Sequence, residues 1–208
     1  MLLTVPLPAV SKEIHGYETG VNISLGPGAL RKNTYGASNT AIGTGVLKEN
    51  TKGKSNTAIG HAALYRNTKG NDNTAMGTKA LISNTEGSQN TAMGMNALLR
   101  NTVSGSTAVG AEALRENTTG KGNVALGFKV LTSNTIANFN SAVGYQALEK
   151  NVTGASNTAL GYVALGKNNN DHQNTAIGYE ALKENTGGRT NTAVGGSALR
   201  RNRTGQLN

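Results

Sequence analysis

The sequence predicts an all-β fold: a parallel β-solenoid of eleven 17-residue coils. Three observations predict it. One glycine recurs every 17 residues from Gly26 to Gly195, with a single step of 16 between Gly94 and Gly110. Each unit repeats the consensus Asn-Thr-Ala-Ile/Val/Met-Gly-x-x-Ala-Leu-x-x-Asn-Thr-x-Gly-x-Ser. The 208 residues include 28 glycines, no tryptophan, two phenylalanines and six tyrosines, a composition poorly suited to filling a spherical core.

We expect two parts along the chain. Residues 22–208 form the repeat array, and residues 1–21 form a cap or attachment segment in front of it. Asn208 has the register of the residue that opens each coil, so the array is expected to be cut off in mid-repeat. Met1–Val10 is apolar but lacks a basic flank, so we do not expect a signal peptide. No apolar run approaches the ~20 residues of a membrane span.

Each Asn-Thr-Ala-Ile-Gly stretch is predicted to be a strand. Its threonine and its aliphatic residue are two positions apart and share a face, while the alanine between them points the other way. Because a 17-residue unit must also make two turns, it has room for two short strands. The glycine after the aliphatic residue and the later Asn-Thr-x-Gly indicate those turns. Propensity alone leaves a helix open for the x-Ala-Leu-x-x segment.

Three apolar columns are expected to be buried. The first is leucine in every unit, from Leu30 to Leu199. The second is always aliphatic or methionine, from Leu25 to Val194, and the third is the alanine that precedes it, from Ala41 to Ala193.

Two asparagine columns are predicted to stabilise the stack. The first is invariant, from Asn33 to Asn202, and the second runs from Asn39 to Asn191 with one interruption at Ser106. In a stack, each side-chain amide would donate to the next asparagine and accept from the previous one. The alternative is that asparagine simply tolerates left-handed turns. Both interpretations are structural.

The two positions between the leucine and the invariant asparagine are strongly basic and supply most of the net charge of +9. We call these residues the basic ridge: Arg31, Lys32, Lys48, Arg66, Arg100, Arg115, Lys150, Lys167, Lys183, Arg200 and Arg201. Such a ridge would attract an acidic surface, such as lipopolysaccharide or capsule. The alternative, which we favour, is a solvated face that resists aggregation. Nucleic acid is the weaker partner, because no aromatic residues interleave with the charges.

The position after the repeat glycine becomes aromatic in four consecutive coils. These residues form what we call the aromatic ladder: Phe128, Tyr145, Tyr162 and Tyr179. At coil spacing the rings are expected to be offset-stacked and to stabilise each other. The functional alternative is a stacking platform for sugar rings, and it is the leading candidate for a binding site.

Nothing in the sequence predicts an enzyme or a cofactor. There is no cysteine, and no pair of carboxylates recurs at one position. Asp171 and His172 lie in one turn, where we expect an exposed loop and no metal site.

The units Asn56–Gly60 and Asn174–Leu182 resemble the repeats of trimeric surface fibres. They are similar to the Asn-Ser-Val-Ala-Ile-Gly repeats in the heads of trimeric autotransporter adhesins. They are more similar still to the Asn-Thr-Ala-x-Gly-x-x-Ala-Leu arrays of phage tail-fibre-like proteins, which often precede a C-terminal chaperone domain of the endosialidase type. The 17-residue unit is longer than the adhesin-head unit, so its turns must differ.

The resemblance implies a left-handed parallel β-roll, a homotrimer, and a place outside the cell, on a bacterial surface or a virion. One apolar stripe would then fill the roll and another the trimer axis, and the sequence does not decide which. The function implied is a structural or adhesive fibre segment, with a cell-surface glycan as the candidate ligand. The alternative is an ice- or solute-binding solenoid that uses the threonine columns from Thr40 to Thr192 and from Thr34 to Thr135. The first column shares a face with the aliphatic residues, so it is expected to be at least half-buried.

Overall fold

The computed structural model describes residues 16–17 and 20–208, and the rest of the predicted cap segment lies outside this description. The described residues contain strands and turns and no helix. A long row of three-residue strands follows a short hairpin of β1 (Gly16–Tyr17) and β2 (Gly20–Val21). The row consists of β3 (Ile23–Leu25), β4 (Thr40–Ile42), β5 (Thr57–Ile59), β6 (Thr74–Met76), β7 (Thr91–Met93), β8 (Thr107–Val109), β9 (Val124–Leu126), β10 (Ser141–Val143), β11 (Thr158–Leu160), β12 (Thr175–Ile177) and β13 (Thr192–Val194).

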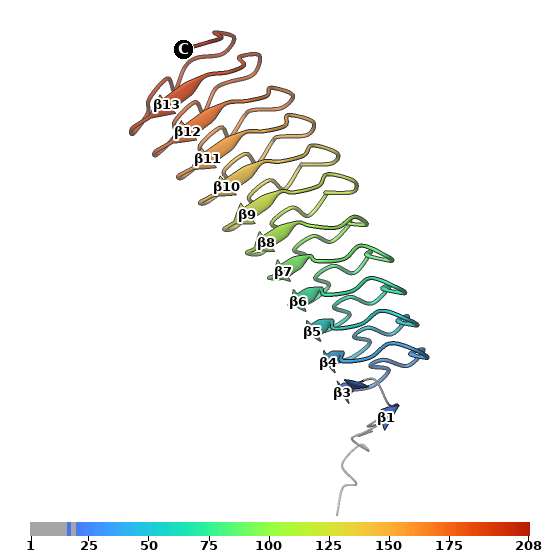
Figure 1. Cartoon of the computed structure of the whole chain (residues 1–208). Coiled ribbons are helices and arrows are strands. Elements are labelled where there is room, and N and C mark those ends of the chain that lie inside the picture. Colours follow the sequence, from blue (N-terminus) through green and yellow to red (C-terminus); the bar gives the residue numbers. More distant parts are fainter. Residues whose placement is uncertain (1–15, 18–19) are drawn as a thin grey trace, which may run out of the picture.

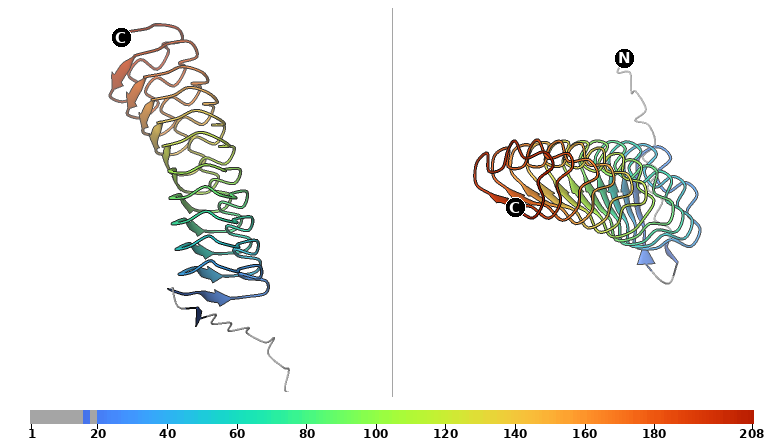
Figure 2. Two further views of the ribbon diagram at one scale, coloured as in Figure 1. Left: turned by 45° about the vertical axis from the view of Figure 1, so that its right-hand side comes forward. Right: turned by 90° about the horizontal axis from the view of Figure 1, so that it is seen from above.

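Strands β3 to β13 form one eleven-stranded parallel sheet in chain order, which confirms the predicted β-solenoid. Each strand pairs with the same positions of the next coil, as Thr57 does with Thr74. The coils stack into a rod with the sheet along one wall (Figure 1). Seen from above, each coil is a flattened loop (Figure 2). At the spacing of parallel strands, eleven rungs extend over roughly 50 Å.

Each coil contains one strand and not the two that we expected. The wall opposite the sheet is a succession of turns whose backbone groups bond to the next coil. For example, the N–H of Leu47 donates to the carbonyl of Ala63 at 3.1 Å, and that of Glu49 donates to Tyr65 at 3.0 Å. The coils are therefore hydrogen-bonded along both walls, although only one wall has the geometry of a strand.

The second wall bends at the leucine column, where sequence reasoning placed no turn. All eleven of these leucines have a left-handed backbone, with φ of 49° at Leu47 and 50° at Leu98. This conformation costs a β-carbon-bearing residue about 1–3 kcal/mol. Here it directs the leucine side chain into the coil, where it is fully buried from Leu47 to Leu182. Burial of a leucine side chain stabilises the fold by a similar amount, which offsets this cost.

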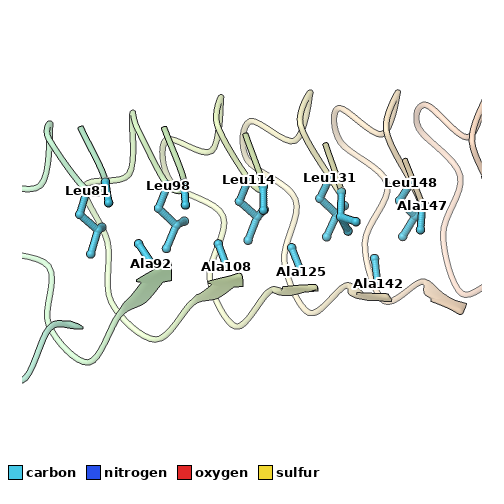
Figure 3. Close-up of a cluster of buried hydrophobic side chains, with 14 of the residues drawn as sticks. Leu81, Ala92, Leu98, Ala108, Leu114, Ala125, Leu131, Ala142, Ala147 and Leu148 are labelled. Atoms are coloured by element: carbon cyan, nitrogen blue, oxygen red, sulfur yellow. The ribbon is translucent and has the colours of Figure 1, made fainter. Parts of the chain in front are cut away.

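The core is a thin layer between the two walls. Alanines of the strands, such as Ala92 and Ala108, face leucines of the opposite wall, such as Leu98 and Leu114 (Figure 3). A second alanine column, one residue before each leucine in most coils, completes the layer. The alanine and leucine columns are thus buried as expected. The prediction that the aliphatic column is also buried is wrong, because that column shares the outward face of the strand with the threonines.

Both asparagine columns form the predicted ladders, with the opposite direction of donation. In the column that runs from Asn33 to Asn202, the turn ladder, Nδ2 of Asn67 donates to Oδ1 of Asn50 in the preceding coil at 2.8 Å. In the column just before each strand, the strand ladder, Nδ2 of Asn56 donates to Oδ1 of Asn39 at 3.0 Å. Asn56 and Asn67 also donate to one shared acceptor, the carbonyl of Gly70, at 2.9 and 3.0 Å. The two ladders therefore join at this carbonyl and satisfy their buried amides.

The 16-residue unit keeps its register in the sheet and loses a residue in the turn before β8. Thr91 of β7 still pairs with Thr107 of β8. At the other end of the array, Asn208 donates to Oδ1 of Asn191 at 3.0 Å, so it has the expected register of a coil-opening asparagine.

Candidate binding surfaces

The outward face of the sheet is an apolar strip that runs the whole length of the array. We call it the outer strip; it consists of the aliphatic column and the neighbouring threonine column. Leu25, Met76, Leu126, Leu160 and Val194 are among the aliphatic members that are more than a third exposed. No outward-facing residue of β3 to β13 is charged. Because isolated soluble chains rarely expose so continuous an apolar surface, the strip is a candidate contact surface.

The threonine column of the outer strip is predicted to be at least half-buried, and this holds for only some of its members. Thr57 and Thr107 are half-buried, whereas Thr158 and Thr192 are exposed. The other threonine column lies in the turns, and most of its hydroxyls donate to backbone carbonyls of the next coil. Oγ1 of Thr51 donates to the carbonyl of Thr68 at 3.0 Å, and Oγ1 of Thr118 donates to that of Thr135 at 2.9 Å.

The aromatic ladder is stacked as predicted. The ring centroids of Phe128 and Tyr145 are 5.4 Å apart, those of Tyr145 and Tyr162 are 5.3 Å apart, and those of Tyr162 and Tyr179 are 5.2 Å apart. The two tyrosine pairs are nearly parallel, with 8° between the ring planes. Each ring is between 40% and 57% exposed.

This stacking limits what the ladder can offer to a ligand. Both faces of Tyr145 and of Tyr162 are covered by neighbouring rings, so these residues present only their edges. The ladder ends at Ala111 on one side and at Gly196 on the other. A β-carbon placed on Gly196 would meet no atom within 4 Å, so the space beside it is open. The outer face of Tyr179 is therefore the surface on which a sugar ring has room to stack.

The basic ridge divides into two parts that differ in charge pairing. Seven of its eleven members pair with carboxylates: Lys32, Arg100, Arg115, Lys150, Lys167, Lys183 and Arg200. Two of the acids involved, Glu112 and Glu180, lie outside the ridge, two positions after the repeat glycine. The hydrogen bond from Lys183, at 2.7 Å, is the main cause that lowers the pKa of Glu180. Among the described residues of the later coils, the ridge is thus largely neutralised.

The N-terminal coils are different. Within residues 20–208, Lys48 and Arg66 form no ion pair. They line a groove of about 380 Å³, together with Arg31, Tyr65 and Lys79, which we call the N-terminal groove. Sequence reasoning missed this groove and the contribution of Tyr65 and Lys79. The sequence does contain a signal for the groove: the residue two positions after the repeat glycine is small in the first three coils.

Asp171 and His172 do not form the exposed loop that we expected. Asp171 is 4% exposed, and its buried Oδ2 has no hydrogen-bond partner among the described residues. Burial raises the pKa of Asp171, against the lowering effect of Arg189 and His172. His172 accepts a hydrogen bond at Nδ1 from the N–H of Ala155 at 2.9 Å. Across the described part of the chain, no three histidine or acidic side chains gather in a way that would hold a metal ion.

Comparison with models of known protein families, with curated proteins and with solved structures finds no match in any of the three. In the described residues, no helix is long and apolar enough to cross a membrane.

Proposed function

We propose that this chain is a non-catalytic segment of an extracellular fibre that assembles as a homotrimer and attaches to a cell surface by repeated contacts. The observation that carries the proposal is the outer strip. The interior of the coil is already filled by the alanine and leucine columns. The aliphatic column is left over and uncharged, and its members are exposed or partly exposed along the full length of the sheet.

A second copy of the same chain is the partner that suits this strip best. Its repeat would have the same spacing, so threonine and aliphatic rungs of parallel chains meet rung by rung. At roughly 50 Å in length, the strip is long enough for an extended interface. Three strips that converge on one axis would each be covered by the other two, which closes the assembly. The left-handed winding expected from the resemblance belongs to this proposal.

The oligomeric state tests the proposal. Size-exclusion chromatography with light scattering should give three times the mass of the chain. Ile59→Lys and Val109→Lys place a charge in the outer strip and should yield folded monomers, because an unpaired charge is costly in an apolar contact. Thr119→Lys is the matched control, since its column already holds Lys52 and Lys69. A folded monomer for the unmodified chain, or three variants that behave alike, would contradict the proposal.

Ice or solute binding is the second candidate, favoured by one observation. The threonines of β4 to β8 and of β11 to β13 form outward rows on a parallel sheet. Thermal hysteresis of the purified chain measures this activity directly. Activity that disappears in Thr57→Lys and persists in Thr119→Lys would favour this function over the fibre.

A further inference from the structure

The N-terminal groove exists because one column changes along the array. Two positions after the repeat glycine, the first three coils have Gly28, Gly45 and Ala62. All three line the groove and form its floor. The next coil has Lys79 at this position, and the later coils have asparagine, glutamate, lysine, glutamine, valine and serine there. The next hollow along the rod differs in charge, because Arg100 and Arg115 line it together with the carboxylate of Glu116.

The same column adds acids to the ridge in two later coils. In later coils it supplies Glu112, which forms an ion pair with Arg115 at 3.2 Å, and Glu180, which forms ion pairs with Lys183 and Arg200. In the first three coils it supplies no acid. None of the described residues that line the groove is acidic. The nearby Glu49 pairs with Lys32 at 2.5 Å. The groove therefore combines a concave shape with Lys48, Arg66 and Lys79, which have no carboxylate partner within residues 20–208.

Tyr65 makes the groove wall ordered and partly apolar. Its ring packs against the backbone of Gly45 in the preceding coil, so close that a β-carbon on Gly45 would lie 3.4 Å from Cδ2 of the ring. Nζ of Lys48 donates to the phenolic oxygen at 3.0 Å and lies 5.2 Å from the ring centroid. Lys48 is thereby held beside the ring, and no carboxylate of the described residues pairs with it. Pro27 and Ile82 extend the apolar lining.

From these contacts we infer that the N-terminal groove binds an acidic oligosaccharide, a unit of a polysaccharide that carries carboxylate or sulfate groups. Lys48, Arg66 and Lys79 bind the anionic groups, and the floor, together with Pro27 and Ile82, contacts the apolar faces of the sugar rings. The volume of about 380 Å³ is at the small end of ligand sites. It suits a short stretch of an oligosaccharide and is too small for a nucleic-acid duplex. Single-stranded nucleic acid is a poor fit, because Tyr65 is the one Phe, Tyr or Trp side chain among the described residues that line the groove, and its ring is covered by Gly45 and Lys48.

This inference deepens the attachment role proposed above and rests on it for its biological setting. The two proposals can fail separately. A trimer that does not bind acidic sugars would contradict the groove proposal and leave the trimeric fibre supported. A monomer that binds acidic sugars would support the groove proposal and contradict the trimer.

The test is a titration of the full chain with three oligosaccharides of equal length: sulfated chondroitin fragments, oligogalacturonate and neutral maltohexaose. We expect at least one acidic probe to bind and the neutral one not to. The triple variant Lys48→Gln, Arg66→Gln, Lys79→Gln should weaken binding by about tenfold or more, because it removes the charge-assisted contacts. The control triple, Arg100→Gln, Lys150→Gln, Lys167→Gln, removes the same charge from paired ridge residues. It should change binding by less than about threefold.

A charge-neutral variant tests the shape of the groove. Ala62→Gln places a larger side chain in the floor of the groove. Coil eight has a glutamine, Gln146, at the same column. The backbone φ is nearly equal at the two positions, 56° at Ala62 and 54° at Gln146. It should obstruct the groove and weaken binding while the net charge of the chain stays the same. Ser197→Gln is the control, at the same column and with φ of 59°, far from the groove. Circular dichroism melts establish that each variant is folded.

Four results would overturn the inference. They are no binding of either acidic probe, equal losses in the two triple variants, unchanged binding in folded Ala62→Gln, and tighter groove-dependent binding of oligothymidine or phosphatidylglycerol vesicles. Preference between the sulfated and the carboxylated probe identifies which anionic group the groove selects.

Discussion

Asn84 and Asn101 occupy consecutive rungs of the turn ladder, but Asn101 does not donate to Asn84. Its Nδ2 bonds the carbonyl of Val103 at 2.7 Å instead. Oδ1 of Asn84 is buried and has no hydrogen-bond partner among the described residues. The strand ladder is interrupted in the same coil, at Ser106. Both interruptions coincide with the 16-residue unit, so the missing residue weakens one junction of the stack. In a solenoid, stability is close to a sum over neighbouring coils, so this junction is expected to be the weakest.

The first prediction compares an intact rung with the interrupted one. Asn67→Ala removes the hydrogen bonds that Asn67 donates to Asn50 and to the carbonyl of Gly70. It also removes the Oδ1 atom that accepts a hydrogen bond from Asn84. Asn101→Ala removes fewer contacts, since the rung toward Asn84 is already absent. We expect Asn67→Ala to lower the free energy of unfolding by about 2–3 kcal/mol, and by about 1 kcal/mol more than Asn101→Ala. Urea unfolding followed by circular dichroism measures both. Equal losses would mean that the ladder rung contributes little.

The second prediction is that the strand ladder can be repaired. Ser106→Asn would place an amide between Asn90 and Asn123, with the carbonyl of Gly120 within reach of the present hydroxyl at 3.5 Å. It should raise the free energy of unfolding by about 1 kcal/mol, through hydrogen bonds that serine cannot make. Ser106→Ala is the control and should be neutral or slightly destabilising. A melting temperature that falls in Ser106→Asn would show that the shortened turn has no room for the amide.

The third prediction concerns Asp171 and pH. Its carboxylate is buried and its pKa is raised, so the folded chain binds this proton more tightly than the unfolded chain does. Stability therefore falls as pH rises from the ordinary carboxyl range up to the raised pKa, and stays at the lower level above it. Asp171→Ala keeps the β-carbon, as Ala137 does at the same column, and removes the buried charge. It should raise stability by about 1 kcal/mol at pH 7.5, because the unpaired oxygen is removed.

The same substitution should have little effect below the ordinary pKa of an aspartate, where the side chain is protonated in both states. Thermal melts at pH 7.5 and pH 3.5, each compared with the unmodified chain, separate the two cases. A gain of equal size at both pH values would assign the effect to packing and not to ionisation.

Sequence reasoning succeeded for the features that every coil repeats. The period predicted the stacked coils, and the two asparagine columns predicted the ladders, because identical residues at one coil spacing satisfy each other's hydrogen bonds. Alternation showed correctly that Thr57 and Ile59 share a face. It did not show which face is inside, because both faces of the strand have apolar members. The thinness of the coil decides this: only alanine leaves room for the leucine of the opposite wall.

The missed features depend on backbone geometry or on single variable residues. Leucine rarely adopts a left-handed backbone, so no propensity rule predicts the bend at Leu47. The N-terminal groove depends on three small residues in one column, whose effect appears only once the coils are stacked. For the aromatic ladder the residues and the stacking were predictable, but the covering of the inner ring faces follows from the stacked geometry.

The last prediction distinguishes the inside of the aromatic ladder from its end. Tyr162→Ala removes two stacking contacts, and Tyr179→Ala removes one. Each contact contributes about 0.5–1.5 kcal/mol, so Tyr162→Ala should be roughly twice as destabilising. Glycan binding should show the reverse order if sugars stack on the ladder, because Tyr162 is stacked on both sides, whereas Tyr179 has an open outer face. A glycan array of both variants beside the unmodified chain measures this. Binding that is lost equally in folded Tyr162→Ala would mean that ring edges contact the sugar, and no binding in any sample would leave the ladder a purely structural feature.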